Sequence, residues 1–525
     1  MKNHIKEAAV AAMMVLALVS CRKESDTVHN FSYADELVWH KAESSFGEQF
    51  KILWEGLNTN YAIWDYEKEQ GLDWDAVYDK YYPKFTELDT LAKKDTVKDE
   101  QLRVLLQEVL DPLHDGHLQV QLYNYKTKNF IRRVSPNEDR LQKERAADYN
   151  EAVERGYPVE PNLYYYTTLQ GKLLDYKTVD ASSSTQFLSV RDSLKMWADR
   201  ILAVTTAKTL LTDEELSNEQ LARRVKADLE QLADLSGQAQ IDGLSALALK
   251  YGYLNIDGVH TLDASLMESG IKMTYALLEG NIAYLYFDIF TISPYLGKFQ
   301  QKEQREMMEP YAVTLADNVY NVWTSWFGTI QSLHKAGQLG GVIIDVRGNG
   351  GGLVSDYQYV LGALLPSGGL HVMDTRMKRG VGRYDYSPLV PQVMRTYEQP
   401  HVTVTEPIVV LANTRSVSMS EMTSMGTKVV DNAKLVGTRT WGGFCGLVGN
   451  ESYSYTYAGY VGVKGKTPVY AYCPCVASFT PDGKLLEAVG VTPDIEVHLD
   501  KDAWQYGAGP DSQLDRAVEY IKTGK

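Results

Sequence analysis

The sequence predicts an α/β (α+β, multidomain) protein, with a helical domain ahead of an α/β half, on three observations. Apolar runs typical of strands buried on both faces alternate with helical segments from about residue 276 onward. Before the first expected strand, Trp39, Phe46, Phe50 and Trp54 recur at near-helical spacing. The length of 525 residues is enough for about three domains.

The N-terminus is typical of a bacterial export signal. Lys2 and Lys6 precede an apolar run over residues 8–19 that is too short to span a bilayer. The run ends in LVSC, residues 18–21, which resembles the lipobox of lipoproteins and implies cleavage before Cys21 and lipid attachment to its thiol. An ordinary signal peptide with an incidental cysteine is the alternative.

If Cys21 is lipidated, residues 22–30 form a tether, and the protein is an outer-membrane lipoprotein of the cell envelope that faces the periplasm or the cell surface. Its contact with the membrane is then expected through the lipid anchor only.

Composition excludes several partner classes. The formal net charge is −15 and no long basic run occurs, so we expect no nucleic-acid partner. Cys445, Cys473 and Cys475 have no nearby histidine and make a poor zinc site. The Cys-Pro-Cys spacing leaves room for at most one disulfide, to Cys445. We expect neither a metal nor a cofactor.

The helical domain is expected over residues 31–122. Pro112 and Gly116 break its last helix, and the alternating residues 118–122 begin a strand. His117 therefore falls at a helix–turn–strand junction, where its side chain can be aimed into a cleft. A surface histidine is the alternative, and His114 is its close rival. A mostly helical middle region, residues 123–275, follows.

An α/β domain is expected over residues 276–500, with a helical tail over residues 501–525. Buried strands at residues 280–287 and 340–346 flank a helix at about 301–336, and the second strand runs into the glycines 350–352. Leu353 stands where a dinucleotide-binding loop needs glycine, and no P-loop lysine follows. Glycine N–H groups that form an oxyanion hole remain possible.

A third buried strand, residues 408–412, leads through turn residues into Ser416, Ser418 and Ser420. A serine where a buried strand turns into a helix is presented as nucleophilic serines are, beside the free N–H groups of the helix start. The alternative is a simple capping box between Ser418 and Glu421.

Four separated motifs together resemble the tail-specific (C-terminal processing) peptidases and their tricorn relatives. They are Asp345-Val346-Arg347-x-Asn349-x-Gly351-Gly352, Ser416-Val417-Ser418-Met419-Ser420-Glu421, Gly490-Val491-x-Pro493-Asp494 and Asp115-Gly116-His117. The resemblance implies a crotonase/caseinolytic-protease-like catalytic domain. It also implies that Ser418 is the nucleophile, with Met419 and Gly351 or Gly352 as oxyanion donors.

The lysine of the family's Ser/Lys dyad is missing, because Gly443 stands in its place. A serine alcohol needs a partner to take its proton. The tricorn-like branch uses a histidine from the N-terminal domain and a glutamate near the C-terminus, and His117 and Glu487 match these positions. Glu487 would orient the imidazole or stabilise its charged form.

The resulting hypothesis is an exported, lipid-anchored serine endopeptidase that cleaves peptides or proteins. No convincing PDZ carboxylate loop occurs in residues 123–275, although the family usually carries one. A catalytically silent peptide- or glycopeptide-binding lipoprotein is the first alternative. A crotonase-like acyl-CoA enzyme is the second, and the export signal opposes it because acyl-CoA substrates are cytoplasmic.

Overall fold

The computed structural model describes residues 39–154, 173–180, 213–232, 271–306, 310–366, 368–380, 382–394, 400–446, 459–499 and 511–525, with isolated positions between 195 and 308. The predicted export signal, Cys21 and the tether lie outside these ranges, as does most of the middle region. No helix of the described part is long and apolar enough to cross a membrane.

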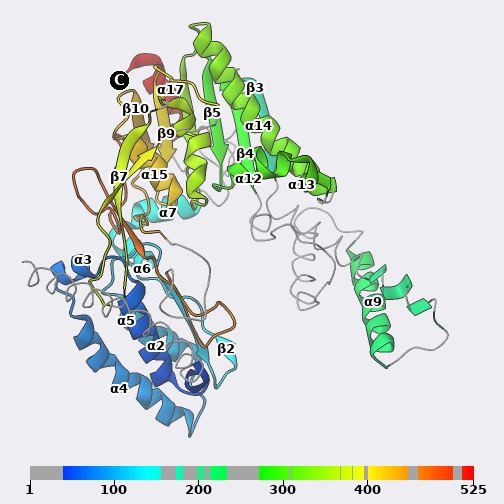
Figure 1. The fold of residues 1–525 in the computed structure, drawn as a ribbon, viewed down its shortest axis with the longest axis vertical. Coiled ribbons are helices and arrows are strands. Elements are labelled where there is room, and N and C mark those ends of the chain that lie inside the picture. The colour runs from blue at the N-terminus through cyan, green and yellow to red at the C-terminus, as the bar shows by residue number, and fades with distance from the viewer. Residues whose placement is uncertain are drawn as a thin grey trace, which may run out of the picture.

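The N-terminal part is helical, and two of its helices begin at residues suited to capping. Ser45 accepts the N–H of Glu48, and Asp73 accepts the N–H groups of Asp75 and Ala76. Phe50 and Phe85 stack at 4.7 Å in the shared core. The helices are α2 (Phe46–Asn60), α3 (Trp64–Glu69), α4 (Trp74–Ala92) and α5 (Asp99–Leu110) (Figure 1).

A four-stranded antiparallel sheet joins the two ends of the chain. Its order is β11 (Tyr460–Val461), β12 (Val469–Tyr472), β1 (Gln119–Asn124) and β2 (Asn129–Phe130). β1 pairs with β12 from Gln119 opposite Tyr472 to Leu122 opposite Val469. Residues that the sequence assigns to the catalytic domain therefore pack into the core of the N-terminal helices.

A seven-stranded mixed sheet forms the second body, which confirms the predicted α/β class. From β14 to β5 its strands are parallel, and β4 and β3 add on antiparallel. Its order is β14 (Ile495–Glu496), β10 (Ala433–Gly437), β9 (Ile408–Ala412), β6 (Gly341–Asp345), β5 (Ile282–Phe287), β4 (Lys272–Leu278) and β3 (Leu173–Asp180).

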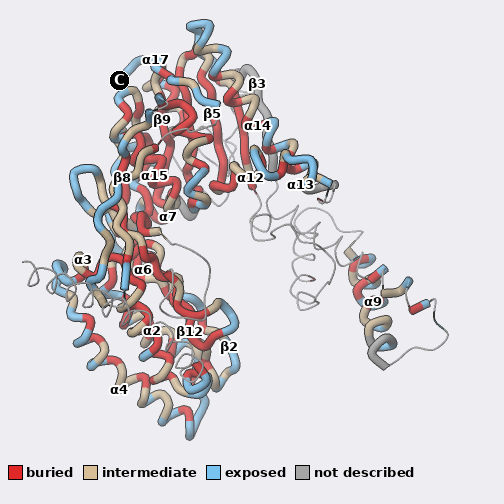
Figure 2. The backbone as a smooth tube through the Cα atoms, viewed as in Figure 1, coloured by how far each residue is buried: buried red, intermediate tan, exposed pale blue. Residues whose placement is uncertain are grey.

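Helices cover both faces of this sheet, so its central strands are buried throughout, as their apolar runs predict (Figures 1 and 2). Alternate residues of β6 show the division: Val342 and Ile344 pack with the α14 and α15 side, and Ile343 packs with the α17 side. The covering helices are α14 (Pro310–Lys335), α15 (Met419–Gly426) and α17 (Ser512–Thr523).

The remaining described elements are further helices and one small sheet. Two short 3-10 helices follow the glycine loop, Val354–Tyr359 and Gly362–Leu364. The others are α6 (Pro136–Glu144), α7 (Ala146–Glu154), α9 (Asp213–Gln231), α12 (Ile292–Leu296), the 3-10 helix Lys298–Gln300, α13 (Lys302–Glu306), and a three-stranded sheet of β13 (Val476–Phe479), β7 (Leu370–Met377) and β8 (Val390–Met394).

Candidate active site

Ser418 occupies a strained position between β9 and α15. Its φ of 56° lies in the left-handed region, which a non-glycine residue adopts at a cost of roughly 1–3 kcal/mol. The N–H of Ser418 donates to the carbonyl of Gly443 at 3.2 Å and to the carboxylate of Glu421 at 3.2 Å. Tertiary contacts thus hold the backbone at the sharp turn typical of a presented nucleophile.

The two neighbouring serines have structural partners. Ser416 Oγ donates to the carbonyl of Val346 at 2.7 Å, and Ser420 Oγ donates to the carbonyl of Asn349 at 2.8 Å. Both hydroxyls cross-link the serine turn to the loop that follows β6. Ser418 forms the capping box with Glu421 that the sequence offers as the alternative, but its hydroxyl makes no such cross-link among the described residues. It is therefore the candidate nucleophile of the three.

Gly351 lies against Ser418 in a conformation that suits glycine. Its φ is 96°, and a Cβ placed on it would be 2.6 Å from Ser418 Cβ and 3.1 Å from Met419 N. Met419 is the first residue of α15, where N–H groups lack intrahelical partners. The Gly351 N–H donates to Asn349 Oδ1 at 2.8 Å in this conformation.

Gly352 pairs with a different segment, the one that follows β5. It forms a β-bridge with Phe290, and a Cβ placed on it would meet the Phe290 carbonyl oxygen at 2.2 Å. Of the two predicted glycine donors, Gly351 is the one in contact with Ser418.

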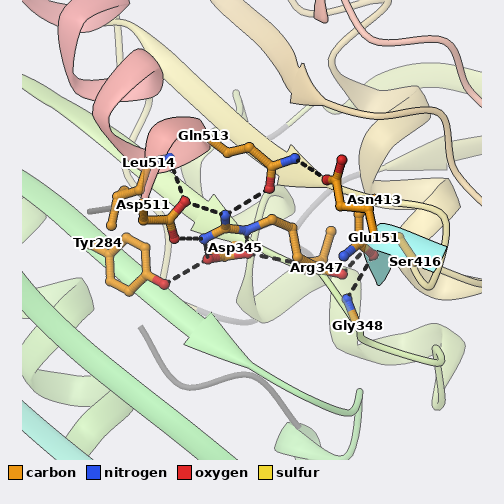
Figure 3. Close-up of polar contacts among 11 residues, drawn as sticks. Glu151, Tyr284, Asp345, Arg347, Gly348, Asn413, Ser416, Asp511, Gln513 and Leu514 are labelled. Carbon is orange, nitrogen blue, oxygen red and sulfur yellow. Dashed lines mark hydrogen bonds and ion pairs between the residues drawn. The ribbon is translucent and has the colours of Figure 1, made fainter. Parts of the chain in front are cut away.

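A buried ion-pair network anchors the start of the glycine loop (Figure 3). The Arg347 guanidinium donates to Asp345 Oδ2 at 2.6 Å and to Asp511 Oδ1 at 2.8 Å, and all three side chains are fully buried. Gln513 accepts a further bond from Arg347 at 2.9 Å, and Tyr284 donates to Asp345 at 2.7 Å. The network ties the end of β6 to the first turn of α17.

The turn before β1 brings His117 to the serine turn. A Cβ on Gly443 would be 3.0 Å from His117 Cε1 and 3.1 Å from Val417 Cγ1, so this glycine lies between the imidazole and the residue before Ser418. A side chain at the position of the family's lysine would collide with the His117 ring. The ring also lies 6.1 Å from that of Tyr472.

The imidazole of His117 is held neutral. Burial lowers its pKa to about 4, and Nδ1 has no hydrogen-bond partner within the described part of the chain. The neutral ring is the form that can accept a proton. The rival His114 is engaged elsewhere, because its Nδ1 lies 2.7 Å from the buried carboxylate of Glu67.

Glu487 reaches the site but binds backbone rather than the imidazole. Its carboxylate accepts the N–H groups of Gly116 at 2.5 Å, Phe444 at 2.6 Å and Cys445 at 2.5 Å. No hydrogen bond joins Glu487 to the His117 ring among the described residues. The predicted orientation of the ring by Glu487 would therefore act through the two loops that it connects.

Two further buried acids, Glu421 and Asp115, stand in motifs of the sequence but were given no role in the site from it. Glu421 accepts Thr440 Oγ1 at 2.6 Å and the N–H groups of Gly442 and Gly443 at 2.7 Å, and burial raises its pKa to about 7. Asp115 accepts the N–H groups of the His117 turn. The capping-box position of Glu421 and the proximity of Asp115 to His117 were the available signals.

The three described cysteines form no disulfide. Cys445, Cys473 and Cys475 are all buried free thiols, and burial raises the pKa of Cys445 and Cys473.

Comparison with known proteins identifies a domain within the chain. Residues 312–497 match the model of Peptidase family S41, a segment that contains Ser418 and Glu487 but not His117. The tricorn protease of Thermoplasma volcanium is 30% identical over 182 residues, which are 34% of this chain and 14% of that protein. The tricorn protease homolog of Saccharolobus solfataricus is 30% identical over 208 residues, 39% of this chain and 16% of that protein. The matches thus span a small fraction of these relatives.

Solved structures show similarity over a greater length of this chain. A putative peptidase from Parabacteroides merdae is 15% identical, with a TM-score of 0.49, and the match covers 92% of this chain and 98% of that one. Mature CPAF complexed with lactacystin is 13% identical, with a TM-score of 0.43, over 93% of this chain and 98% of that one.

Proposed function

We propose that this chain, in which residues 312–497 match the model of Peptidase family S41, is a serine endopeptidase acting on peptides or proteins, with Ser418 as nucleophile and His117 as general base. The observation that carries this proposal is the meeting of the two segments at Gly443. Its carbonyl accepts the Ser418 N–H, and its Cα faces the His117 ring.

In the proposed reaction, His117 removes the proton from Ser418 Oγ as this oxygen attacks the peptide carbonyl, and it returns that proton to the leaving amine. A water molecule then repeats the sequence on the acyl-enzyme. The Met419 N–H stabilises the oxyanion, joined by that of Gly351 if Asn349 releases or shares it. A general base is worth about 10²–10⁴-fold and each oxyanion donor about 10²–10³-fold.

Glu487 is assigned a positioning role in this reaction. By accepting N–H groups from Gly116 on one side and from Phe444 and Cys445 on the other, it holds the His117 turn against the loop that borders Ser418. Its removal is expected to misplace the base rather than to change the pKa of the imidazole directly.

The test is covalent labelling of folded protein without its export signal by a fluorophosphonate, which reacts only with an activated serine. Ser418→Ala and His117→Ala are expected to abolish labelling, and His114→Ala, the matched histidine control, is expected to retain it. Loss of labelling with His114→Ala instead would show that His114, and not His117, is the base. A folded wild type that never labels would favour the peptide- or glycopeptide-binding alternative.

Export and lipid anchoring complete the proposal and rest on residues 1–21. Acylation of Cys21 predicts that the full chain fractionates with membranes and that Cys21→Ala releases it. Mass spectrometry of the N-terminal peptide tests the modification, and an unmodified Cys21 in membrane-bound protein would contradict it.

A further inference from the structure

Two buried carboxylates lie beneath the turn that carries His117. The side chains of Asp115 and Glu487 are fully buried, although they come from opposite ends of the sequence. One carboxylate oxygen of each and the Cys445 sulfur all lie within 4.8 Å of one another. Two negative charges this close in a fully buried site would repel strongly.

The carboxylate of Glu487 accepts three backbone N–H groups. Its Oε1 accepts the N–H of Gly116, and its Oε2 accepts those of Phe444 and Cys445. Several N–H donors aimed at one carboxylate favour its charged form.

The carboxylate of Asp115 is only half satisfied. Its Oδ1 accepts the N–H groups of His117 at 2.7 Å and Leu118 at 2.5 Å. Its Oδ2 is buried and has no hydrogen-bond partner within the described part of the chain. An ionised oxygen in that position would lose its hydration without any donor in return, and a proton on it removes this cost.

The surrounding charges do not offset this repulsion. Two further carboxylates add to it: Glu67 raises the pKa of Asp115, and Glu421 raises that of Glu487. The Arg140 guanidinium opposes this effect by favouring the charged form of Asp115. Burial is the largest influence on both acids: it raises the pKa of Asp115 to about 7 and that of Glu487 well above its ordinary value. Both carboxyls therefore favour a proton, and the backbone N–H donors on Glu487 decide in favour of Asp115 as the one that holds it. The negative charge of Asp115 also raises the pKa of four neighbouring groups, Tyr61, Cys445, Tyr472 and Cys473.

We propose that Asp115 and Glu487 together carry a single proton, bound at Asp115 Oδ2. Asp115 then holds the His117 turn in its neutral form, while the ionised Glu487 joins that turn to the loop of residues 441–445. Asp115 is then a positioning residue that works in its neutral form. Its influence on catalysis rests on the proposed function of His117, but its protonation does not.

The substitution Asp115→Asn tests this assignment because it reproduces the protonated acid. The amide oxygen can accept the N–H groups of His117 and Leu118, and the amide nitrogen can donate from the position of Oδ2. By contrast, both carboxylate oxygens of Glu487 accept backbone N–H groups. Glu487→Gln replaces one of these oxygens by an amide nitrogen, which is a donor and would face another donor. The exposed Asp111→Asn, four residues earlier, is the matched control.

The first measurement is infrared spectroscopy of folded protein with isotope-labelled aspartate at pH 6. We expect the carbonyl stretch of a protonated carboxylic acid in the wild type and in Asp111→Asn, and its loss in Asp115→Asn. This readout is independent of peptidase activity. Its absence from the folded wild type would overturn the proposal even if the protein proves to be a peptidase.

The second measurement is thermal stability against pH. The folded pKa of Asp115 is raised, so its contribution to stability is complete below about 3.8 and is lost as the pH rises to about 7. The melting temperature of Asp115→Asn should therefore rise relative to the wild type across this window. A difference in melting temperature that stays constant across this window would contradict a proton at Asp115 Oδ2.

Fluorophosphonate labelling adds the functional readout. Asp115→Asn should keep most of the wild-type rate at pH 7, whereas Asp115→Ala should lose at least tenfold. Equal loss in both would show that the charge of Asp115 is needed, which overturns the proposal. A tightly bound metal found by elemental analysis, whose removal by a chelator lowers the melting temperature, would assign the cluster with Cys445 to metal binding instead.

Discussion

At the scale of single residues, the candidate site depends on the lack of a side chain at position 443. Gly443 leaves the space that the His117 ring occupies, while its carbonyl holds the Ser418 N–H. The missing lysine and the presence of the N-terminal histidine are therefore linked by packing. The same residue would exclude one base and admit the other.

Gly443→Ala should accordingly displace His117 and reduce fluorophosphonate labelling about 10²-fold or more, as loss of a general base does. Circular dichroism should show an intact fold. Gly446→Ala in the same loop is the control, because its added Cβ would meet nothing closer than Val476 Cβ at 3.8 Å. Wild-type labelling by the Gly443 variant would show that the ring does not need this space.

The depressed pKa of His117 predicts an unusual pH profile. Because burial lowers this pKa to about 4, labelling should persist well below the pH of about 6.5 at which an exposed histidine is half protonated. The unfolded chain binds this proton more readily, so His117 should also reduce stability as the pH falls through the same window. A labelling midpoint near pH 6.5 would show that burial does not lower the pKa of His117, which is half-buried.

At the scale of elements, the end of β6 is fixed by the buried Arg347 network. Arg347→Met would leave Asp345 and Asp511 buried without their cation, and removal of one partner of a buried pair costs about 3–5 kcal/mol. Urea denaturation measures this loss.

The control for Arg347 is Lys84→Ala, which breaks the exposed pair between Lys84 and Glu108. Exposed pairs contribute about 0–1 kcal/mol, so its unfolding midpoint should barely move. Similar losses in the two variants would show that the Arg347 network contributes no more than a surface pair.

At the scale of the whole molecule, the candidate site is assembled where the two bodies meet. Arg145, between α6 and α7, donates to Thr414 Oγ1 at 3.2 Å and to the carbonyls of Arg439 at 2.7 Å and Thr440 at 3.0 Å. One side chain from the N-terminal half thus contacts both loops that border Ser418.

Arg145→Ala should therefore slow labelling severalfold without removing any group that reacts, because the relative position of base and nucleophile is less well held. The exposed Arg132→Ala should label normally. A normal rate in Arg145→Ala would mean that the pairing of β1 with β12 suffices to align the two bodies.

The sequence alone indicated the α/β class, the buried strands at β6 and β9, and the family resemblance. These follow from apolar periodicity, turn residues and short motifs, which are local properties of the chain. Ser418, His117 and Glu487 were selected by such motifs and remain predictions as catalytic residues, with Cys21 outside the described part.

Only the tertiary structure decided how the pieces meet. It showed that β12 belongs to the N-terminal sheet and that His114 is hydrogen-bonded to Glu67. It also showed that Glu487 accepts three backbone N–H groups and does not bind the imidazole. It also placed Asp115 beside Glu487. These contacts join residues hundreds of positions apart, and burial shifts the pKa values of their acids, so no local pattern of residues encodes them.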